Sequence, residues 1–95
     1  MKELTQEDRK KISSFTFGAI VTAFEGQYKG ADYKVLHNQF NRLEEAYVVN
    51  GYTRDIVAGL VELQEKTKEY PFIMSVIGYQ LGQISILQEL LKRQT

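Results

Sequence analysis

Two long stretches of this chain contain no charged residue, and they constrain the fold more than any other feature. They span residues 12–24 and 71–88. In both, apolar side chains recur at helical spacing and cover most of the helix circumference. A helix that is apolar over so wide an arc must be buried on more than one side. The chain therefore needs a large apolar surface against which to pack these two helices.

The first uncharged stretch lies in a helix predicted over residues 5–28. Thr5 is a suitable N-cap, and acidic residues follow it in the first turn, where the helix dipole favours them. Two apolar sets follow at helical spacing. One set is Ile12, Phe15, Ala19 and Ala23, and the other is Phe17, Ile20, Val21, Phe24 and Tyr28. Both sides of this helix are therefore expected to contact other parts of the protein.

Two middle helices are predicted over residues 32–50 and 53–69, each with one apolar stripe. Asp32 can cap the first, Asn50-Gly51 can end it in left-handed conformations, and Thr53 can cap the second. The stripes are Tyr33, Leu36, Phe40, Leu43 and Tyr47, then Ile56, Leu60, Leu63 and Thr67. A type I′ hairpin around Asn50-Gly51 is the alternative, but no other strand completes a sheet.

The second uncharged stretch lies in the last predicted helix, over residues 71–93, which begins at Pro71. This helix is apolar over most of its circumference. One stripe is made of small residues, namely Ser75, Gly78, Gly82 and Ser85. A glycine inside a helix costs about 1 kcal/mol relative to alanine, so two in register indicate that something packs closely there. That neighbour is either a second copy of this helix or another helix of the same chain.

These segments predict one all-α domain over residues 1–95, a compact four-helix bundle with short connections. A chain of 95 residues has a small interior, which cannot hide two helices that are apolar nearly all round. We therefore expect a homo-oligomer built on the last helix, with the first helix assisting. The expected interface residues are Phe17, Val21, Ser75, Gly78, Gly82 and Ser85.

The composition argues against several classes of function. The chain has no cysteine, which excludes disulfides, thiolate catalysis and cysteine-based zinc sites. Its formal net charge is zero, whereas nucleic-acid and anionic-membrane binders usually carry a basic surplus. The polar N-terminus has no apolar region typical of a secretory signal. Serines and glutamines interrupt residues 71–88, which argues against a membrane span. A cytoplasmic protein is the expectation.

Few residues are suited to catalysis or metal binding. His37 is the only histidine, and it borders an apolar stripe, as a histidine at the edge of a core would. Glu62, Glu65 and Glu69 share a helix face, but lysines interleave with them and no second acidic pair faces them, so a solvated face is the favoured interpretation. We expect no catalytic residue, no metal and no cofactor.

Two alternatives involve a bound small molecule or DNA. An oligomer could sequester a small ligand, such as a nucleotide, through the polar groups of Arg42, Tyr47, Tyr52, Arg54, Gln80 and Gln83. The segments 32–50 and 53–69 could also form a helix-turn-helix around Gly51. Its DNA-contacting surface would contain one cation, Arg54, and two carboxylates, Asp55 and Glu62. Because carboxylates repel phosphates, this surface is poorly suited to DNA.

The favoured function is therefore non-enzymatic. We expect a small helical interaction protein, a homo-oligomer that binds a protein partner and so blocks or sequesters it. In style the chain is similar to small regulators and inhibitors encoded by bacteria and their phages, although no residue motif assigns it to a family.

Overall fold

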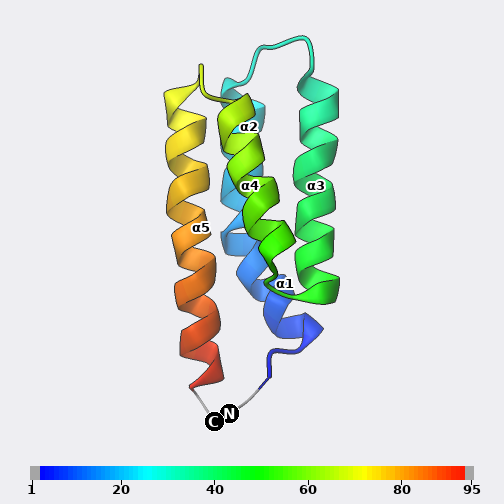
Figure 1. Cartoon of the computed structure of the whole chain (residues 1–95), viewed down its shortest axis with the longest axis vertical. Coiled ribbons are helices and arrows are strands. Elements are labelled where there is room, and N and C mark those ends of the chain that lie inside the picture. Colours follow the sequence, from blue (N-terminus) through cyan, green and yellow to red (C-terminus); the bar gives the residue numbers. More distant parts are fainter. Residues whose placement is uncertain (1–2, 94–95) are drawn as a thin grey trace.

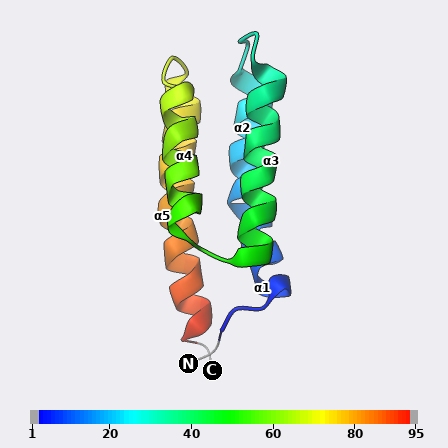
Figure 2. The same ribbon diagram turned by 45° about the vertical axis from the view of Figure 1, so that its right-hand side comes forward.

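Four antiparallel helical segments lie side by side in the computed structural model, which describes residues 3–93 (Figure 1). The first segment is divided in two. The helices are α1 (Gln6–Phe15), α2 (Phe17–Gln27), α3 (Tyr33–Asn50), α4 (Arg54–Lys66) and α5 (Pro71–Lys92). The chain runs up, down, up and down, so the first and last described residues lie at the same end (Figure 2). The predicted all-α bundle is confirmed.

Each helical segment packs against two neighbours, and the four segments enclose one core. α2 contacts α5, α5 contacts α4, α4 contacts α3, and α3 contacts both α1 and α2. The bundle is elongated, with extents of 45 × 21 × 20 Å. The largest fully buried side chains in its core are Tyr47, Phe17, Phe24, Phe40, Ile20, Leu36, Ile56, Leu60, Ile73, Ile77 and Ile84.

A break at Thr16 divides the first predicted helix, which we had expected to be continuous. The Thr16 hydroxyl donates to the carbonyl oxygen of Ile12 at 2.8 Å. The hydroxyls of Ser13 and Ser14 both donate to the carbonyl of Lys10. Side-chain hydroxyls that bond back to carbonyls of the preceding turn bend helices. Three such bonds within four residues explain why the helix changes course between α1 and α2.

Several of the predicted helix caps are present. Thr5 and Asp8 form a reciprocal capping box at the start of α1. Thr53 accepts a hydrogen bond from the backbone N–H of Ile56 at the start of α4. Gly51 ends α3 with a φ of 86°, a left-handed value that favours glycine. Asn50 remains helical, so only the glycine of the predicted Asn50-Gly51 pair is left-handed.

Two other helix ends differ from the prediction. The Asp32 carboxylate does not cap α3, because it accepts a hydrogen bond from the Tyr28 hydroxyl instead. α4 ends at Lys66 rather than at residue 69. Buried Thr67 leaves the helix there, and its hydroxyl bonds to the carbonyl of Leu63 at 2.9 Å. The helix thus ends before Pro71 requires it.

The junction of α3 and α4 matches neither alternative proposed for it. Residues 48–50 are helical, so the type I′ hairpin is wrong. α3 and α4 run antiparallel and side by side (Figures 1 and 2). The two helices of a helix-turn-helix instead cross at about 90–120°. Within residues 3–93, none of the helices combines the length and apolar character needed to cross a membrane.

Candidate functional site

The first segment buries members of both of its apolar sets but leaves one aromatic ring outside the core. Phe17, Ile20 and Phe24 are fully buried in the core, whereas Phe15 is 76% exposed. The prediction that Phe17 is an interface residue is therefore wrong, since its own chain covers it completely. Val21 is half-buried and packs against the core of the same chain. The set that contains Phe15 is divided, since Ile12 and Ala23 are buried whereas Phe15 lies outside.

α5 has a second apolar stripe outside the core. Its inner stripe includes Ile73, Ile77 and Ile84, which are buried. On the outer side, Phe72 is 58% and Tyr79 is 65% exposed. This outer stripe has 4-3-4-3-4 spacing. It consists of the exposed Phe72, Tyr79, Ile86 and Leu90, the half-buried Val76, which also packs against the core, and one polar member, Gln83. Such spacing is typical of a helix that packs against another helix along a seam.

A groove of about 660 Å³ runs along the surface between α2 and α5. Small residues of α2 form one wall, residues of α5 form the other, and Phe15 completes the lining. None of the lining residues is charged. We use the term α2–α5 face for this groove and the exposed ring beside it: Phe15, Gly18, Ala19, Thr22, Gly26, Phe72, Val76, Tyr79 and Gln80.

The glycines of α2 make the groove hollow although nothing in the same chain requires them. A Cβ atom added at Gly26 would meet no atom within 4 Å, and one at Gly18 would meet only the Ser13 carbonyl oxygen, at 3.9 Å. Each glycine inside a helix costs about 1 kcal/mol relative to alanine. Within one chain, no close packing against these two glycines offsets this cost.

The small-residue stripe of α5 lies beside α4 instead. A Cβ at Gly78 would lie 3.2 Å from the side-chain nitrogen of Gln64, whose amide donates to the Met74 carbonyl at 3.0 Å. The Ser85 hydroxyl donates to the Tyr52 hydroxyl at 3.1 Å. Nothing lies within 4 Å of a Cβ at Gly82. Ser75, Gly78, Gly82 and Ser85 are all exposed, and a neighbour from the same chain approaches part of the stripe.

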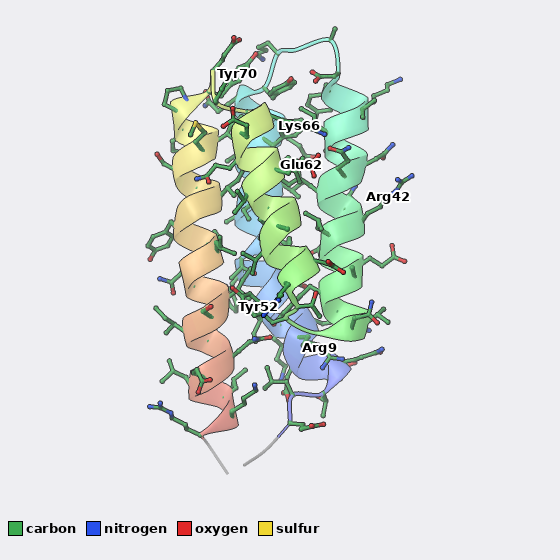
Figure 3. All side chains as sticks on the ribbon, in the orientation of Figure 1. Arg9, Arg42, Tyr52, Glu62, Lys66 and Tyr70 are labelled. Carbon is green, nitrogen blue, oxygen red and sulfur yellow. The ribbon has the colours of Figure 1, made fainter. Side chains whose placement is uncertain are left out.

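The residues predicted to bind a small ligand do not converge on one site. Tyr47 is fully buried, and this burial raises the pKa of its hydroxyl to about 12, so its assignment to a ligand site is wrong. Arg42 points outward from α3 and lines a groove between α3 and α4 (Figure 3). Tyr52 lies near the start of α4, at the end of that helix opposite Lys66. Gln80 lines the α2–α5 groove. Arg54 is exposed at the start of α4, and Gln83 is half-buried on α5.

A small polar pocket of about 180 Å³ lies at the end of the bundle where the chain starts. Arg9 lines it, and its guanidinium donates to the backbone carbonyls of Val48, Leu4 and Val49 at 2.7, 2.7 and 3.3 Å. Buried Gln88 also lines the pocket. Arg9 thus joins α1 to the carboxyl end of α3, where cations suit the helix dipole, and its role is structural.

The candidate acid–base groups are engaged with neighbours. Glu62 pairs with Lys66 at 3.2 Å, and Glu65 pairs with Lys68 at 3.2 Å, as expected for a solvated face. His37 is half-buried, as predicted, and lies 3.0 Å from a carboxylate oxygen of Glu25. In the part of the chain that the structure describes, no group of three or more histidine, aspartate or glutamate side chains is placed to hold a metal ion.

The sequence did not reveal the α2–α5 face because its residues follow the same helical periodicity as the residues of the core. Phe15 and Ala19 share one helical set, and the outer stripe of α5 has regular heptad-like spacing. Helix periodicity shows that such residues share a side, but not whether that side faces inward. Phe17, Ile20 and Phe24 fill the core, whereas Phe15, of similar size, remains outside.

Comparison with known proteins gives no relative to which this face could be matched. No protein family model, no curated protein sequence and no solved structure matches the chain.

Proposed function

We propose that this protein is a non-enzymatic interaction protein, which binds another polypeptide chain through its α2–α5 face. The observation that carries this proposal is the groove itself. It is about 660 Å³ in volume and uncharged, and exposed phenylalanine rings lie on both of its walls. Exposed apolar patches of this kind mark protein-interaction sites.

The chemistry of the groove favours binding over catalysis. Its lining consists of aromatic, aliphatic and small side chains, with hydroxyl and amide groups as the polar members. None of the lining residues titrates between pH 4 and 10, so the groove offers no general acid or base. Aromatic side chains supply large apolar contact areas and are enriched at protein interfaces.

The shape of the face favours a helical segment as the bound element. The outer stripe of α5 offers apolar side chains over most of the helix, at the 4-3-4 spacing of a helix–helix seam. The groove beside it is lined by Gly18, Ala19 and Gly26, which allow another backbone to come close. An apolar helix of the partner fits such a surface better than a compact small molecule does.

The experiment is affinity capture from the native host with three matched baits. Phe15→Asp and Tyr79→Lys, combined in one bait, place charges on exposed positions of the face. Val61→Lys does the same on α4, where Val61 is 49% exposed. We expect a protein that the wild type and Val61→Lys retain and the double variant loses. If all three baits retain the same proteins, the face is not the binding surface.

A further inference from the structure

We infer that the polypeptide that covers the α2–α5 face is a second copy of this chain, related to the first by a two-fold axis. This inference rests on the proposed function, because it names the occupant of the proposed binding surface. It is carried by three properties of the face, which are its self-complementary shape, its area and its lack of charge.

The face presents a projecting ring and a hollow side by side. Phe15 is 76% exposed, and the groove next to it is lined by Thr22 and Gly26. A two-fold interface uses the same patch on both copies, so each projection must find a hollow on the other copy. Here the ring of one copy can enter the groove of the other, and the reverse contact forms at the same time.

The shape indicates which helices meet. If α2 packs antiparallel on α2 of the second copy with the axis between Ala19 and Thr22, Phe15 lies opposite Gly26 of the second copy. In this register Gly26, which has no side chain, faces Phe15, the most exposed aromatic ring. This contact also accounts for Gly26, which has no neighbour within 4 Å of its Cβ position in a single chain.

The exposed rings of the face provide about half of the area that a stable dimer interface buries per partner. Phe15, Phe72 and Tyr79 are 76%, 58% and 65% exposed. Since a buried aromatic side chain hides about 150–250 Å², these three rings leave roughly 400 Å² outside the core of one chain. A stable interface buries about 800 Å² per partner. The rings therefore supply about half of that area, and the small residues of the face add to it.

The lack of charge makes the face compatible with a copy of itself. Two copies of a patch that carries one sign of charge repel each other, and buried unpaired charges are costly. The groove lining contains no charged residue, so neither cost arises when two copies meet. An acidic or basic partner gains no complementary charge from this surface, whereas a second copy needs none.

Sedimentation equilibrium from 1 to 500 μM tests the inference. We expect the wild type to weigh twice its 11.0 kDa chain mass at the upper concentrations. Phe15→Asp and Tyr79→Lys should each raise the dissociation constant at least 100-fold. Val61→Lys and Val35→Asp, at exposed positions on α4 and α3, should leave it within about threefold of wild type. Circular dichroism then checks that each variant remains helical.

Cysteine cross-linking tests the register, because the chain contains no cysteine of its own. Thr22→Cys lies close to the inferred axis, so mild oxidation should link two copies. Val61→Cys should remain unlinked at the same protein concentration. A dimer in which Thr22→Cys fails to cross-link would overturn the α2–α2 contact.

The two proposals fail in different ways. A wild type that sediments as an 11.0 kDa monomer at 500 μM overturns the second copy as the occupant. The proposed function then still stands if affinity capture retains a host protein that the double variant loses. A wild-type dimer that Phe15→Asp and Val61→Lys weaken equally would place the interface elsewhere on the molecule and overturn the inference.

Discussion

Tyr47 buries a hydroxyl that has no hydrogen-bond partner in the described structure. The ring is fully buried and lies 5.7 Å from the ring of Phe17. An unpartnered buried hydroxyl loses its hydration without compensation, so its removal is favourable. We predict that Tyr47→Phe raises the free energy of unfolding by about 1 kcal/mol in urea titrations at pH 7. Tyr28→Phe is the control, and should destabilise because the Tyr28 hydroxyl bonds to Asp32. A destabilised Tyr47→Phe would mean that the hydroxyl is paired.

The same side chain makes stability depend on alkaline pH. Burial raises the pKa of Tyr47 to about 12 in the folded chain, against 10.0 for an ordinary tyrosine. Between these two pH values the Tyr47 hydroxyl loses its proton in the unfolded chain but keeps it in the folded chain. The free energy of unfolding therefore falls as the pH rises above 10. We predict that the advantage of Tyr47→Phe over wild type grows by up to about 1.4 kcal/mol per pH unit from pH 10. The Asp32 bond raises the pKa of Tyr28 to about 12 as well, but both proteins contain Tyr28. An advantage that stays constant up to pH 11.5 would contradict this.

Arg9 is the residue that connects the start of the chain to the end of α3. Three of its N–H groups donate to carbonyls of Leu4, Val48 and Val49. Hydrogen bonds from charged groups contribute about 1.5–3 kcal/mol each, and a flexible ammonium cannot replace the planar fork. We predict that Arg9→Met and Arg9→Lys lower the free energy of unfolding by about 2–3 kcal/mol. Lys10→Ala should cost less than about 0.5 kcal/mol, because its pair with Glu7 is exposed. Equal effects at positions 9 and 10 would refute the structural role of Arg9.

At the scale of the helices, the surroundings of each glycine decide what an added methyl group does. Gly82 lies inside α5 with nothing within 4 Å of a Cβ, so Gly82→Ala should stabilise by about 0.5–1 kcal/mol. Gly30 lies against Tyr28, whose atoms would be 2.5 to 2.7 Å from a Cβ, so Gly30→Ala should destabilise by about 1–3 kcal/mol. Thermal denaturation measures both. If Gly82→Ala instead destabilises the protein, Gly82 must contact a group from outside the single chain.

The positions of the helices could be predicted because local signals in the sequence determine them. The apolar stripe of α3 and the caps at Thr5 and Thr53 depend on residues close in sequence, and they gave the helix boundaries to within a few residues. The break at Thr16 was not predicted. It depends on hydroxyls that bond to the backbone of their own helix, and serine and threonine make such bonds only in some helices.

The orientation of α2 and α5 could not be predicted in the same way. Both helices are apolar on two sides, and periodicity identifies a side without saying what covers it. We assigned Phe17 to an interface, but it is buried in the core, whereas Phe15 is exposed. Side-chain size does not decide the matter either, since Phe15 and Phe17 are the same residue type and only one of them is buried.

At the scale of the whole molecule, the bundle encloses one core but leaves one outer face uncharged and apolar. The outer sides of α3 and α4 carry charged residues, some of them in ion pairs such as Lys66–Glu62. α2 and α5 instead leave Phe15, Phe72 and Tyr79 more than half exposed. A charged bundle with one uncharged apolar face is asymmetric in the way that a paired subunit is.

The inferred dimer also predicts how stability depends on protein concentration. Unfolding of a dimer releases two chains, so a higher concentration favours the folded form. With an unfolding entropy of about 2.1 cal/mol/K per residue over the two chains, a hundredfold rise in concentration should raise Tm by about 7 °C. Differential scanning calorimetry at 5 and 500 μM measures this shift. Val61→Lys should retain it, while Phe15→Asp should melt at the same temperature at both concentrations, because a monomer unfolds independently of concentration. If the Tm of the wild type is equally independent of concentration, the exposed rings of the α2–α5 face do not hold two copies together.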